Sequence, residues 1–232
     1  QNSDIGVSSQ FNYTVIADAG NGINNANLVC NQTNEPYLLS CNIRNAQGNG
    51  IQLYYSHIIL QNSVVKGNAE NGMYLDNSNP TFVSCSISYN GAAGVYLTST
   101  NSLATYSSTA IDHNLYGFHY PSPNFTFSQP TGSPTLTDNF YNGIAVDGGD
   151  INGDNKIWNT LPYDYILLGS IRIGQSQSNV RLTIELENTI KALTGAQIQI
   201  GGYYSCGWSG CPGGGELYAI GTEDSLITFT AY

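Results

Sequence analysis

The sequence is poor in charged residues, which make up only 9% of its 232 residues, against roughly a quarter in ordinary soluble domains. Basic residues are the scarcest, because 6 Lys and Arg stand against 16 Asp and Glu and leave a net charge of −10. Nucleic acids and anionic membrane surfaces attract basic proteins, so both are poor partners for this chain. Long apolar runs are also missing, and none approaches the roughly 20 residues of a membrane-spanning helix.

Helical periodicity is missing as well, since apolar residues do not recur every three or four positions, as amphipathic helices require. The chain begins at Gln1 and carries no signal peptide, so we expect the processed, mature form of a secreted protein. Three sequons, at Asn12, Asn31 and Asn124, are candidate glycosylation sites. Together with the low charge they favour an extracellular or cell-surface location.

What the sequence does contain is a repeat built around glycine. A glycine followed by an apolar–x–apolar strand recurs roughly every 22 to 26 residues, at Gly50, Gly72, Gly94, Gly117 and Gly143. An aliphatic residue stands seven positions before most of these glycines, at Ile43, Val65, Ile87 and Leu136. Because side chains alternate along a strand, each period predicts two short strands with their apolar residues on one face.

Asparagines mark the turns of this repeat, each three positions after the aliphatic residue, at Asn68, Asn90, Asn114 and Asn139. We expect these asparagines and the repeated glycines to adopt left-handed backbone angles. One such unit cannot bury its apolar face alone, but stacked copies build a continuous core. The sequence therefore predicts an all-β fold, a right-handed parallel β-helix (solenoid) in which each coil rises ~4.8 Å.

The repeat also divides the chain into regions. Residues 1–146 contain the coils, and residues 147–164 form an Asp- and Asn-rich connecting loop. Residues 165–232 leave the regular period but remain a series of short alternating runs, which predicts β-rich coils that continue or cap the solenoid. We expect one continuous domain.

Two segments of the repeat, SCNIRNAQGNGIQL (residues 40–53) and SCSISYNGAAGVYL (residues 84–97), resemble coils of the pectate-lyase-like superfamily of parallel β-helix repeat proteins. The resemblance runs from about residue 11 to residue 146 and implies a fold rather than an activity. Near the C-terminus, GTEDSLITFT (residues 221–230) resembles the segment that closes one β-helical unit in large secreted prokaryotic surface proteins.

The stretch DGGDINGDNKIW, residues 147–158, contains candidate calcium ligands: Asp147, Asp150, Asn152, Asp154 and the carbonyl of Lys156. The last four follow the spacing of an EF-hand calcium loop. The bidentate glutamate that normally occupies the twelfth position is replaced by leucine. An Asx-rich turn without metal is the competing interpretation. Calcium is the one cofactor that the sequence points to, and no organic cofactor is expected.

Five cysteines are present. Cys206 and Cys211 enclose a glycine-rich excursion, and we expect a disulfide there because no other Cys or His pair has metal-ligand spacing. Cys41 and Cys85 hold equivalent positions two coils apart, ~9.6 Å by strand spacing, which is too far for a disulfide. These two are therefore expected to be buried free thiols, and Cys30 has no evident partner.

Catalytic residues are not evident. Pectate lyases, which share the fold that the repeat resembles, use clustered acidic calcium ligands with a basic residue, whereas the 6 basic residues here show no clustering at coil spacing. His57, His113 and His119 occupy different coil positions, so no His–carboxylate pair is predicted. We expect a non-enzymatic protein, with an unrecognised polysaccharide lyase or hydrolase as the enzymatic alternative.

Two functions compete on this evidence. A parallel β-helix ends in unpaired strand edges, and no amphipathic helix covers either end in the sequence. The first function is therefore an extracellular structural protein whose copies assemble head to tail into a filament or surface layer. The residues expected at the contact are Ile227, Phe229 and Tyr232 at one end and Ile5 and Val7 at the other.

The second function is a carbohydrate-binding or adhesin module, with glycans as partners. The middle residues of the repeated strands include Tyr74, Tyr96 and His119 and should form an outward column. Aromatic rings in such a column offer flat faces to sugars or to a neighbouring subunit. Tyrosine is also a favourable strand residue, so the column by itself fits both binding and plain stability.

Overall fold

The computed structural model describes residues 9–20, 25–34, 36–99, 102–127, 131–174, 180–204 and 211–232. Within these ranges the chain forms strands and turns without a helix, so the described part offers no long apolar helix that would cross a membrane. The chain divides into two compact units. Unit 1 comprises Gln1–Leu115 and Pro130–Phe140, and unit 2 comprises Tyr116–Gln129 and Tyr141–Tyr232.

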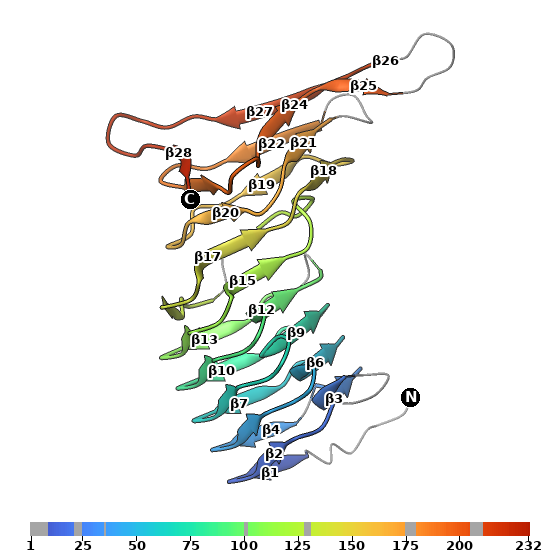
Figure 1. The fold of residues 1–232 in the computed structure, drawn as a ribbon, viewed down its shortest axis with the longest axis vertical. Helices are drawn as coiled ribbons and strands as arrows, with labels where there is room; N and C mark the ends of the chain where they lie inside the picture. The colour runs from blue at the N-terminus through green and yellow to red at the C-terminus, as the bar shows by residue number, and fades with distance from the viewer. Residues whose placement is uncertain are drawn as a thin grey trace, which may run out of the picture. The chain divides into compact units, whose positions relative to one another are not determined.

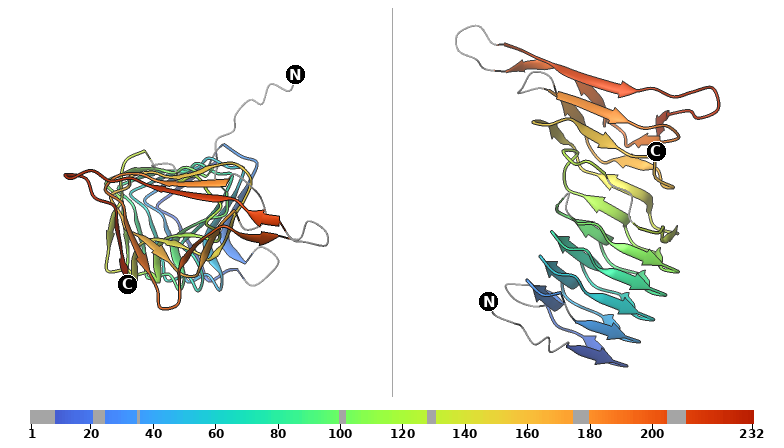
Figure 2. Two further views of the ribbon diagram at one scale, coloured as in Figure 1. Left: turned by 90° about the horizontal axis from the view of Figure 1, so that it is seen from above. Right: turned by 180° about the vertical axis from the view of Figure 1, so that it is seen from behind.

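Unit 1 is a stack of coils, and each complete coil gives one strand to each of three parallel sheets (Figure 1). Sheet A contains β1 (Gln10–Asn12), β4 (Tyr37–Leu39), β7 (Ile59–Gln61), β10 (Thr81–Val83) and β13 (Thr105–Ser107). Sheet B contains β2 (Val15–Ala17), β5 (Asn42–Arg44), β8 (Val64–Lys66), β11 (Ser86–Ser88), β14 (Ala110–Asp112) and β16 (Thr135–Thr137). Sheet C contains β3 (Ala26–Asn31), β6 (Asn49–Tyr54), β9 (Met73–Asp76) and β12 (Ala93–Leu97). Figure 2 (right) shows the same coils from behind.

Single left-handed residues turn the corners of unit 1. Ser40 and Ser84 directly follow strands of sheet A and have φ of 54° and 53°. Tyr89 and His113 directly follow strands of sheet B and have φ of 56° and 53°. One-residue corners keep the strands of successive coils in register, so their equivalent side chains stack inward. The inward aliphatic positions are accordingly fully buried, as at Ile43, Leu60, Val65, Leu75 and Ile87.

A ladder of buried asparagines runs along the corner between sheets B and C. Three side-chain hydrogen bonds connect Asn68, Asn90, Asn114 and Asn139 in series, with Nδ2 to Oδ1 distances of 2.8, 2.9 and 3.0 Å. Their expected left-handed backbone angles are wrong, because the residue before each asparagine makes the turn. That leaves the asparagine side chain pointing inward, where amide groups of neighbouring coils satisfy each other's hydrogen bonds.

The repeated glycines provide space rather than a backbone angle. Gly50, Gly72 and Gly94 have no positive φ, so the expectation is wrong for them too. A Cβ atom on Gly72 would lie 2.6 Å from Ile87 Cγ2 and 2.8 Å from Asn90 Nδ2. A Cβ atom on Gly50 would likewise lie 2.6 Å from Asn68 Nδ2. Real Cβ atoms do not approach other atoms so closely, so these two glycines make room for the ladder of the next coil. The glycine and asparagine periods therefore coincide.

Unit 2 is also a stack of parallel strands. Each coil passes through three sheets, which we call F, E and D in the order in which the chain enters them. Sheet F contains β15 (Tyr116–Tyr120), β17 (Tyr141–Val146), β20 (Tyr165–Leu167), β23 (Thr189–Ala192) and β28 (Thr228–Ala231). Sheet E contains β18 (Gly149–Ile151), β21 (Ile171–Ile173) and β24 (Ile198–Ile200), and sheet D contains β19 (Lys156–Trp158), β22 (Val180–Ile184) and β27 (Gly215–Ala219). An antiparallel hairpin of β25 (Gly202–Tyr204) and β26 (Cys211–Gly213) interrupts the last coil.

Aromatic side chains fill the first part of the unit 2 core. Phe127, Trp158 and Tyr165 are almost completely buried. The Trp158 ring centroid lies 5.2 Å from that of Phe127 and 5.0 Å from that of Tyr165. The Tyr165 hydroxyl donates a hydrogen bond to the Asn159 carbonyl at 2.8 Å, which satisfies its polar end. Aliphatic side chains, such as Ile171 and Ile173, continue the core. The predicted all-β parallel solenoid is confirmed.

The ladder gives a test of what holds unit 1 together. Asn114→Ala removes the acceptor of the Asn90 side chain and a donor to the Ile87 carbonyl. Because buried polar groups lose their partners, we expect the free energy of unfolding to fall by about 2 to 4 kcal/mol, measured by urea denaturation. Asn31→Ala, at an exposed strand position, is the control and should change it by less than about 0.5 kcal/mol. Equal effects would contradict the role of the ladder.

Candidate functional site

The outward tyrosines of sheet C form a stacked pair. Tyr74 and Tyr96 are register partners on β9 and β12, with ring centroids 5.5 Å apart and planes at 24°. Tyr54 contacts the Tyr74 ring at 5.7 Å. Both rings of the pair are partly exposed, whereas Gln52, one coil earlier, is buried. The structure thus brings Tyr74 and Tyr96 together on the surface of unit 1.

His119 lies in unit 2, where its Nε2 atom is 3.0 Å from Asp147 Oδ1. Tyr116 contacts the His119 ring at 4.7 Å and stacks on Tyr141 at 5.4 Å. Desolvation, and then Tyr141 and Asp147, raise the pKa of the Tyr116 hydroxyl above its usual value, so this hydroxyl stays protonated. Sequence reasoning missed this His–carboxylate pair because it compared equal coil positions. It also missed the contact between His113 Nδ1 and Asp112 Oδ1 at 2.7 Å, which forms where His113 turns the corner after sheet B. His119 is in register with Ala145, and Asp147 is the diagonal neighbour two residues later.

Two carboxylates of the predicted calcium loop, Asp147 and Asp150, have protein partners. Asp147 is hydrogen-bonded to His119, as above, and Asp150 on β18 forms an ion pair with Arg172 on β21. Asp150 and Arg172 are register partners on these two strands. Asp150 therefore contributes to a link between neighbouring coils of sheet E.

The remaining loop residues lie at the turn into sheet D. The Asn152 backbone N–H donates to Asn124 Oδ1 at 3.2 Å, Asp154 is exposed in the turn, and Lys156 is the first residue of β19. Among the residues that the structure describes, no three His, Cys, Asp or Glu side chains are grouped so as to hold a metal ion. Asparagine side chains and backbone carbonyls can also be calcium ligands. Calcium binding by this loop therefore stays a prediction.

Three cysteines are buried and free: Cys30, Cys41 and Cys85, as expected for the last two. Cys41 and Cys85 donate to the carbonyls of Phe11 and Leu60 at 3.2 and 3.3 Å. Burial raises the pKa of the Cys30 thiol to about 11 and also raises that of Cys85. The predicted disulfide between Cys206 and Cys211 involves Cys206, which lies outside the described residues, and stays a prediction.

The buried thiols lead to a prediction on reactivity and pH. Thiolates are the species that iodoacetamide alkylates, so Cys30, Cys41 and Cys85 should resist labelling at pH 8 in the folded protein and react readily in denaturant. An unfolded Cys30 ionises near its ordinary pKa of 9.0, whereas the folded one ionises near 11. Its burial should therefore lower the free energy of unfolding as pH rises from 9 to 11. Peptide mass spectrometry reads out the labelling, and rapid labelling of the folded protein would contradict the buried placement.

The three sequons lie in different surroundings. Asn12 and Asn31 are exposed at the last positions of β1 and β3. Asn124 is partly buried and accepts the hydrogen bond from Asn152 described above. The first two offer an accessible side-chain amide, and glycosylation at all three stays a prediction.

Two basic residues do align at coil spacing, contrary to the expectation from sequence. Arg44 and Lys66 are register partners on β5 and β8. In unit 2, three basic side chains have acidic partners on nearby strands or turns, in the pairs Arg172–Asp150, Arg181–Glu216 and Lys191–Asp164. The basic residues of unit 2 thus contribute to links between coils.

The last coil of unit 2 exposes side chains that the preceding coil buries. Phe229 on β28 is in register with Ile190, yet Phe229 is 49% exposed and Ile190 only 1%. Ile200 on β24 is likewise 51% exposed, beside a fully buried Ile173. Phe229 borders an apolar hollow of about 330 Å³, which is lined by Leu167, Ile190, Ala192, Gln197, Ile198, Leu217, Phe229 and Thr230. We call this surface the open coil.

Among the predicted assembly residues, Phe229 lines the open coil. Ile227 is partly buried just before β28, and Tyr232 is 50% exposed and contacts the Tyr141 ring at 5.1 Å. Ile5 and Val7 lie outside the described residues. Sequence reasoning located the C-terminal contact candidates but missed the contribution of sheet E, because the residues of β24 lie outside the ITFT motif.

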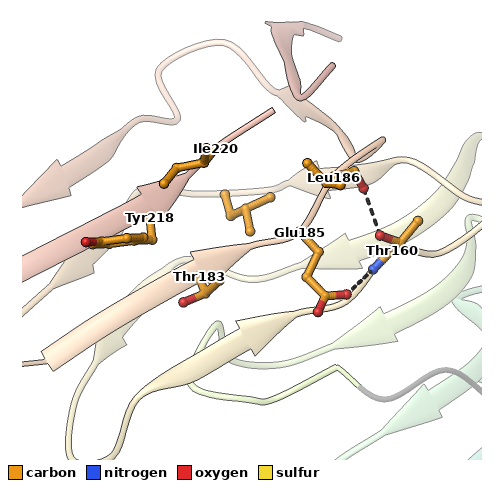
Figure 3. Close-up of a pocket in the computed structure, with 7 residues that line it drawn as sticks. Thr160, Thr183, Glu185, Leu186, Tyr218 and Ile220 are labelled. Carbon is orange, nitrogen blue, oxygen red and sulfur yellow. Dashed lines mark hydrogen bonds between the residues drawn. The ribbon is translucent and has the colours of Figure 1, made fainter. Parts of the chain in front are cut away.

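A second hollow, of about 350 Å³, lies beside sheet D of unit 2 (Figure 3). We call it the Tyr218 pocket, and its lining consists of Thr160, Thr183, Ile184, Glu185, Leu186, Tyr218 and Ile220. The Thr160 backbone N–H donates to Glu185 Oε2 at 3.1 Å, and the Thr160 hydroxyl donates to the Leu186 carbonyl at 2.8 Å. Sequence reasoning gave no sign of this pocket, because its lining comes from three separate segments.

Comparison with known proteins adds one match. A protein-family model described as "Right handed beta helix region" matches residues 21–161, more than half of the chain. No curated protein and no solved structure matches the sequence. The family match agrees with the parallel stacks of both units and with the handedness predicted from the repeat.

Proposed function

The chain belongs to the right-handed β-helix family, whose fold serves structural, binding or enzymatic modules, and we propose that this member is an extracellular structural protein whose copies assemble head to tail. The open coil carries the proposal, because within the described residues inward apolar side chains such as Phe229 are left exposed beside an apolar hollow. Apolar surface of this kind is stabilised by removal from water. The low charge and the two exposed sequons support the extracellular location.

Unpaired strand edges support the same conclusion. In unit 2, the strands β28, β24 and β27 are the last of sheets F, E and D, so each has one unpaired edge within the described residues. In unit 1, the strands β3, β1 and β2 are the first of sheets C, A and B. Backbone groups along such edges form hydrogen bonds with any strand that is presented in register. Both ends therefore offer a backbone template as well as apolar side chains.

Strand order makes the two ends compatible. Following the chain, unit 2 runs from sheet F to sheet E to sheet D, and unit 1 runs from sheet C to sheet A to sheet B. A second copy would place β3 on β28, β1 on β24 and β2 on β27, with all strands parallel. Phe11, Ile16 and Leu28, the middle or inward residues of these first strands, are only partly buried and would cover the open coil. The contact is heterologous and does not close, so repetition gives a filament.

Electron microscopy at rising protein concentration tests the proposal directly. We expect regular fibres with an axial repeat of one molecule. The same grids prepared with calcium and with chelator test the predicted calcium loop, since fibres lost only in chelator would implicate it. Short monodisperse rods at every concentration would contradict head-to-tail assembly.

Substitutions at the open coil identify the contact. Phe229→Asp places a charge on the apolar surface that the next copy would bury, and deletion of Ile227–Tyr232 removes the edge strand. Both should raise the concentration needed for assembly at least tenfold (about 1.4 kcal/mol), measured by sedimentation. Thr228→Asp adds the same charge to an exposed side chain on the same strand, next to Phe229, and should assemble nearly normally. Equal loss in both point variants would argue against the apolar contact.

Glycan binding by the tyrosine pair is a second candidate function, favoured by the partly exposed, stacked rings of Tyr74 and Tyr96. Sugars pack their apolar faces on such rings. Tyr74→Ala and Tyr96→Ala should each remove binding in a glycan-array screen if the pair is the site. Binding that is indifferent to both substitutions would exclude it.

A further inference from the structure

The Tyr218 pocket has the size and the lining of a small-molecule site. Its volume of about 350 Å³ lies within the range of roughly 300 to 1,000 Å³ found for ligand pockets. Leu186, Tyr218 and Ile220 supply apolar walls, and all three are exposed to solvent, Ile220 by 66%. Figure 3 shows them around the same opening as Thr183 and Glu185. The pocket is therefore accessible from outside without a rearrangement of the fold.

The Tyr218 ring is held in place before any ligand binds. Tyr218 is the register partner of Thr183, and the Arg181 guanidinium lies 4.4 Å from the ring centroid. Arg181 is itself fixed by Glu216, with Nη2 to Oε2 at 2.6 Å. A ring that is already ordered loses little entropy on binding, which favours affinity.

The polar groups of the pocket are held in place by the protein and still have donors and acceptors available for a ligand. Glu185 Oε2 accepts the Thr160 N–H, and the second hydrogen bond from Thr160, to Leu186, ties the two loops together. Within the described residues, Glu185 Oε1 and the hydroxyls of Thr183 and Tyr218 make no hydrogen bond to the protein. A carboxylate oxygen accepts hydrogen bonds, and a hydroxyl both donates and accepts. This set suits a ligand that carries several hydroxyl groups.

The charges around the pocket restrict the chemical class of the ligand further. Arg181 is neutralised by Glu216, so Glu185 is the one uncompensated charge among the described residues of the lining, and anionic sugars, phosphates and sulfates are repelled. Organic cations are disfavoured in turn, because Arg181 already occupies a cation–π position on Tyr218. An aromatic ring beside apolar walls, with one carboxylate and two hydroxyls, matches the alternating apolar faces and hydroxyl edges of a neutral sugar.

We propose that the Tyr218 pocket binds one neutral hexose unit of an extended polysaccharide, with Tyr218 under the sugar ring and Glu185 and Thr183 at its hydroxyls. The site lies on sheet D and its flanking loops, and none of its residues lines the open coil. Tyr218 is an outward side chain of β27, whereas assembly would use the backbone edge and the inward side chains of that strand. A filament with this pocket on every copy would hold a neutral polysaccharide by many weak contacts, and multivalency would raise the overall affinity.

The test uses the whole chain and three neutral probes, cellohexaose, mannohexaose and N-acetylchitohexaose, with hexagalacturonate as an acidic comparison. Binding is measured by isothermal titration and by saturation-transfer NMR. We expect at least one neutral probe to bind in preference to hexagalacturonate. Tyr218→Ala and Glu185→Gln should each weaken that binding about tenfold or more, whereas Tyr218→Phe, which keeps the ring, should have a smaller effect.

Matched variants keep the result interpretable. Tyr89→Ala removes an exposed tyrosine of unit 1 that stacks on His113 and should leave binding at the Tyr218 pocket unchanged. Circular dichroism and thermal melting establish that each variant is folded, and Glu185→Gln, which preserves shape, remains informative if Tyr218→Ala is not. The proposal is overturned if no neutral probe binds at about 5 mM, a concentration that detects millimolar affinity. It is also overturned if Tyr89→Ala abolishes binding while both pocket variants retain it, or if hexagalacturonate binds best.

Discussion

The hydrogen-bond ladder of buried asparagines is the constraint on which the structure of unit 1 depends. An amide in an apolar core is tolerated only when its donors and acceptor are paired, and here the partner is the equivalent amide of the next coil. Every coil must therefore return to the same place at the same height. The glycine opposite the ladder and the one-residue corners follow from that requirement, because a Cβ atom or a longer turn would separate the amides.

Unit 2 keeps the parallel stack but stabilises it in a different way. Aromatic rings fill the beginning of its core, and ion pairs connect neighbouring coils on its outer surface. Without a repeating ladder, its coils are free to vary in length and to include the β25–β26 hairpin. That freedom is what allows the pocket beside sheet D, because the residues after β22 and β27 diverge where a strict repeat would keep them stacked.

The two proposed activities use different parts of one architecture. A parallel solenoid grows by adding strands at its edge, so a coil whose apolar side chains remain exposed is suited to a further copy of the same fold. Its outer faces contribute little to the core and can carry ligand-binding side chains without cost to the stack. Structural assembly and saccharide binding are therefore compatible in one chain, because assembly uses strand edges and inward side chains, whereas the Tyr218 pocket uses outward side chains and loops.

The sequence by itself determined the coil. The period of glycine and aliphatic residues predicted the parallel strands and the inward columns, since a two-residue side-chain alternation leaves few ways to bury them. It also located Asn68, Asn90 and Asn114. The left-handed backbone angles predicted for them were wrong, because their side chains point inward to hydrogen-bond partners that lie a full coil away. The His119–Asp147 pair, the open coil and the Tyr218 pocket were decided only by the tertiary structure. Each depends on register between strands or on loops from separate coils, and a linear pattern contains no measure of either.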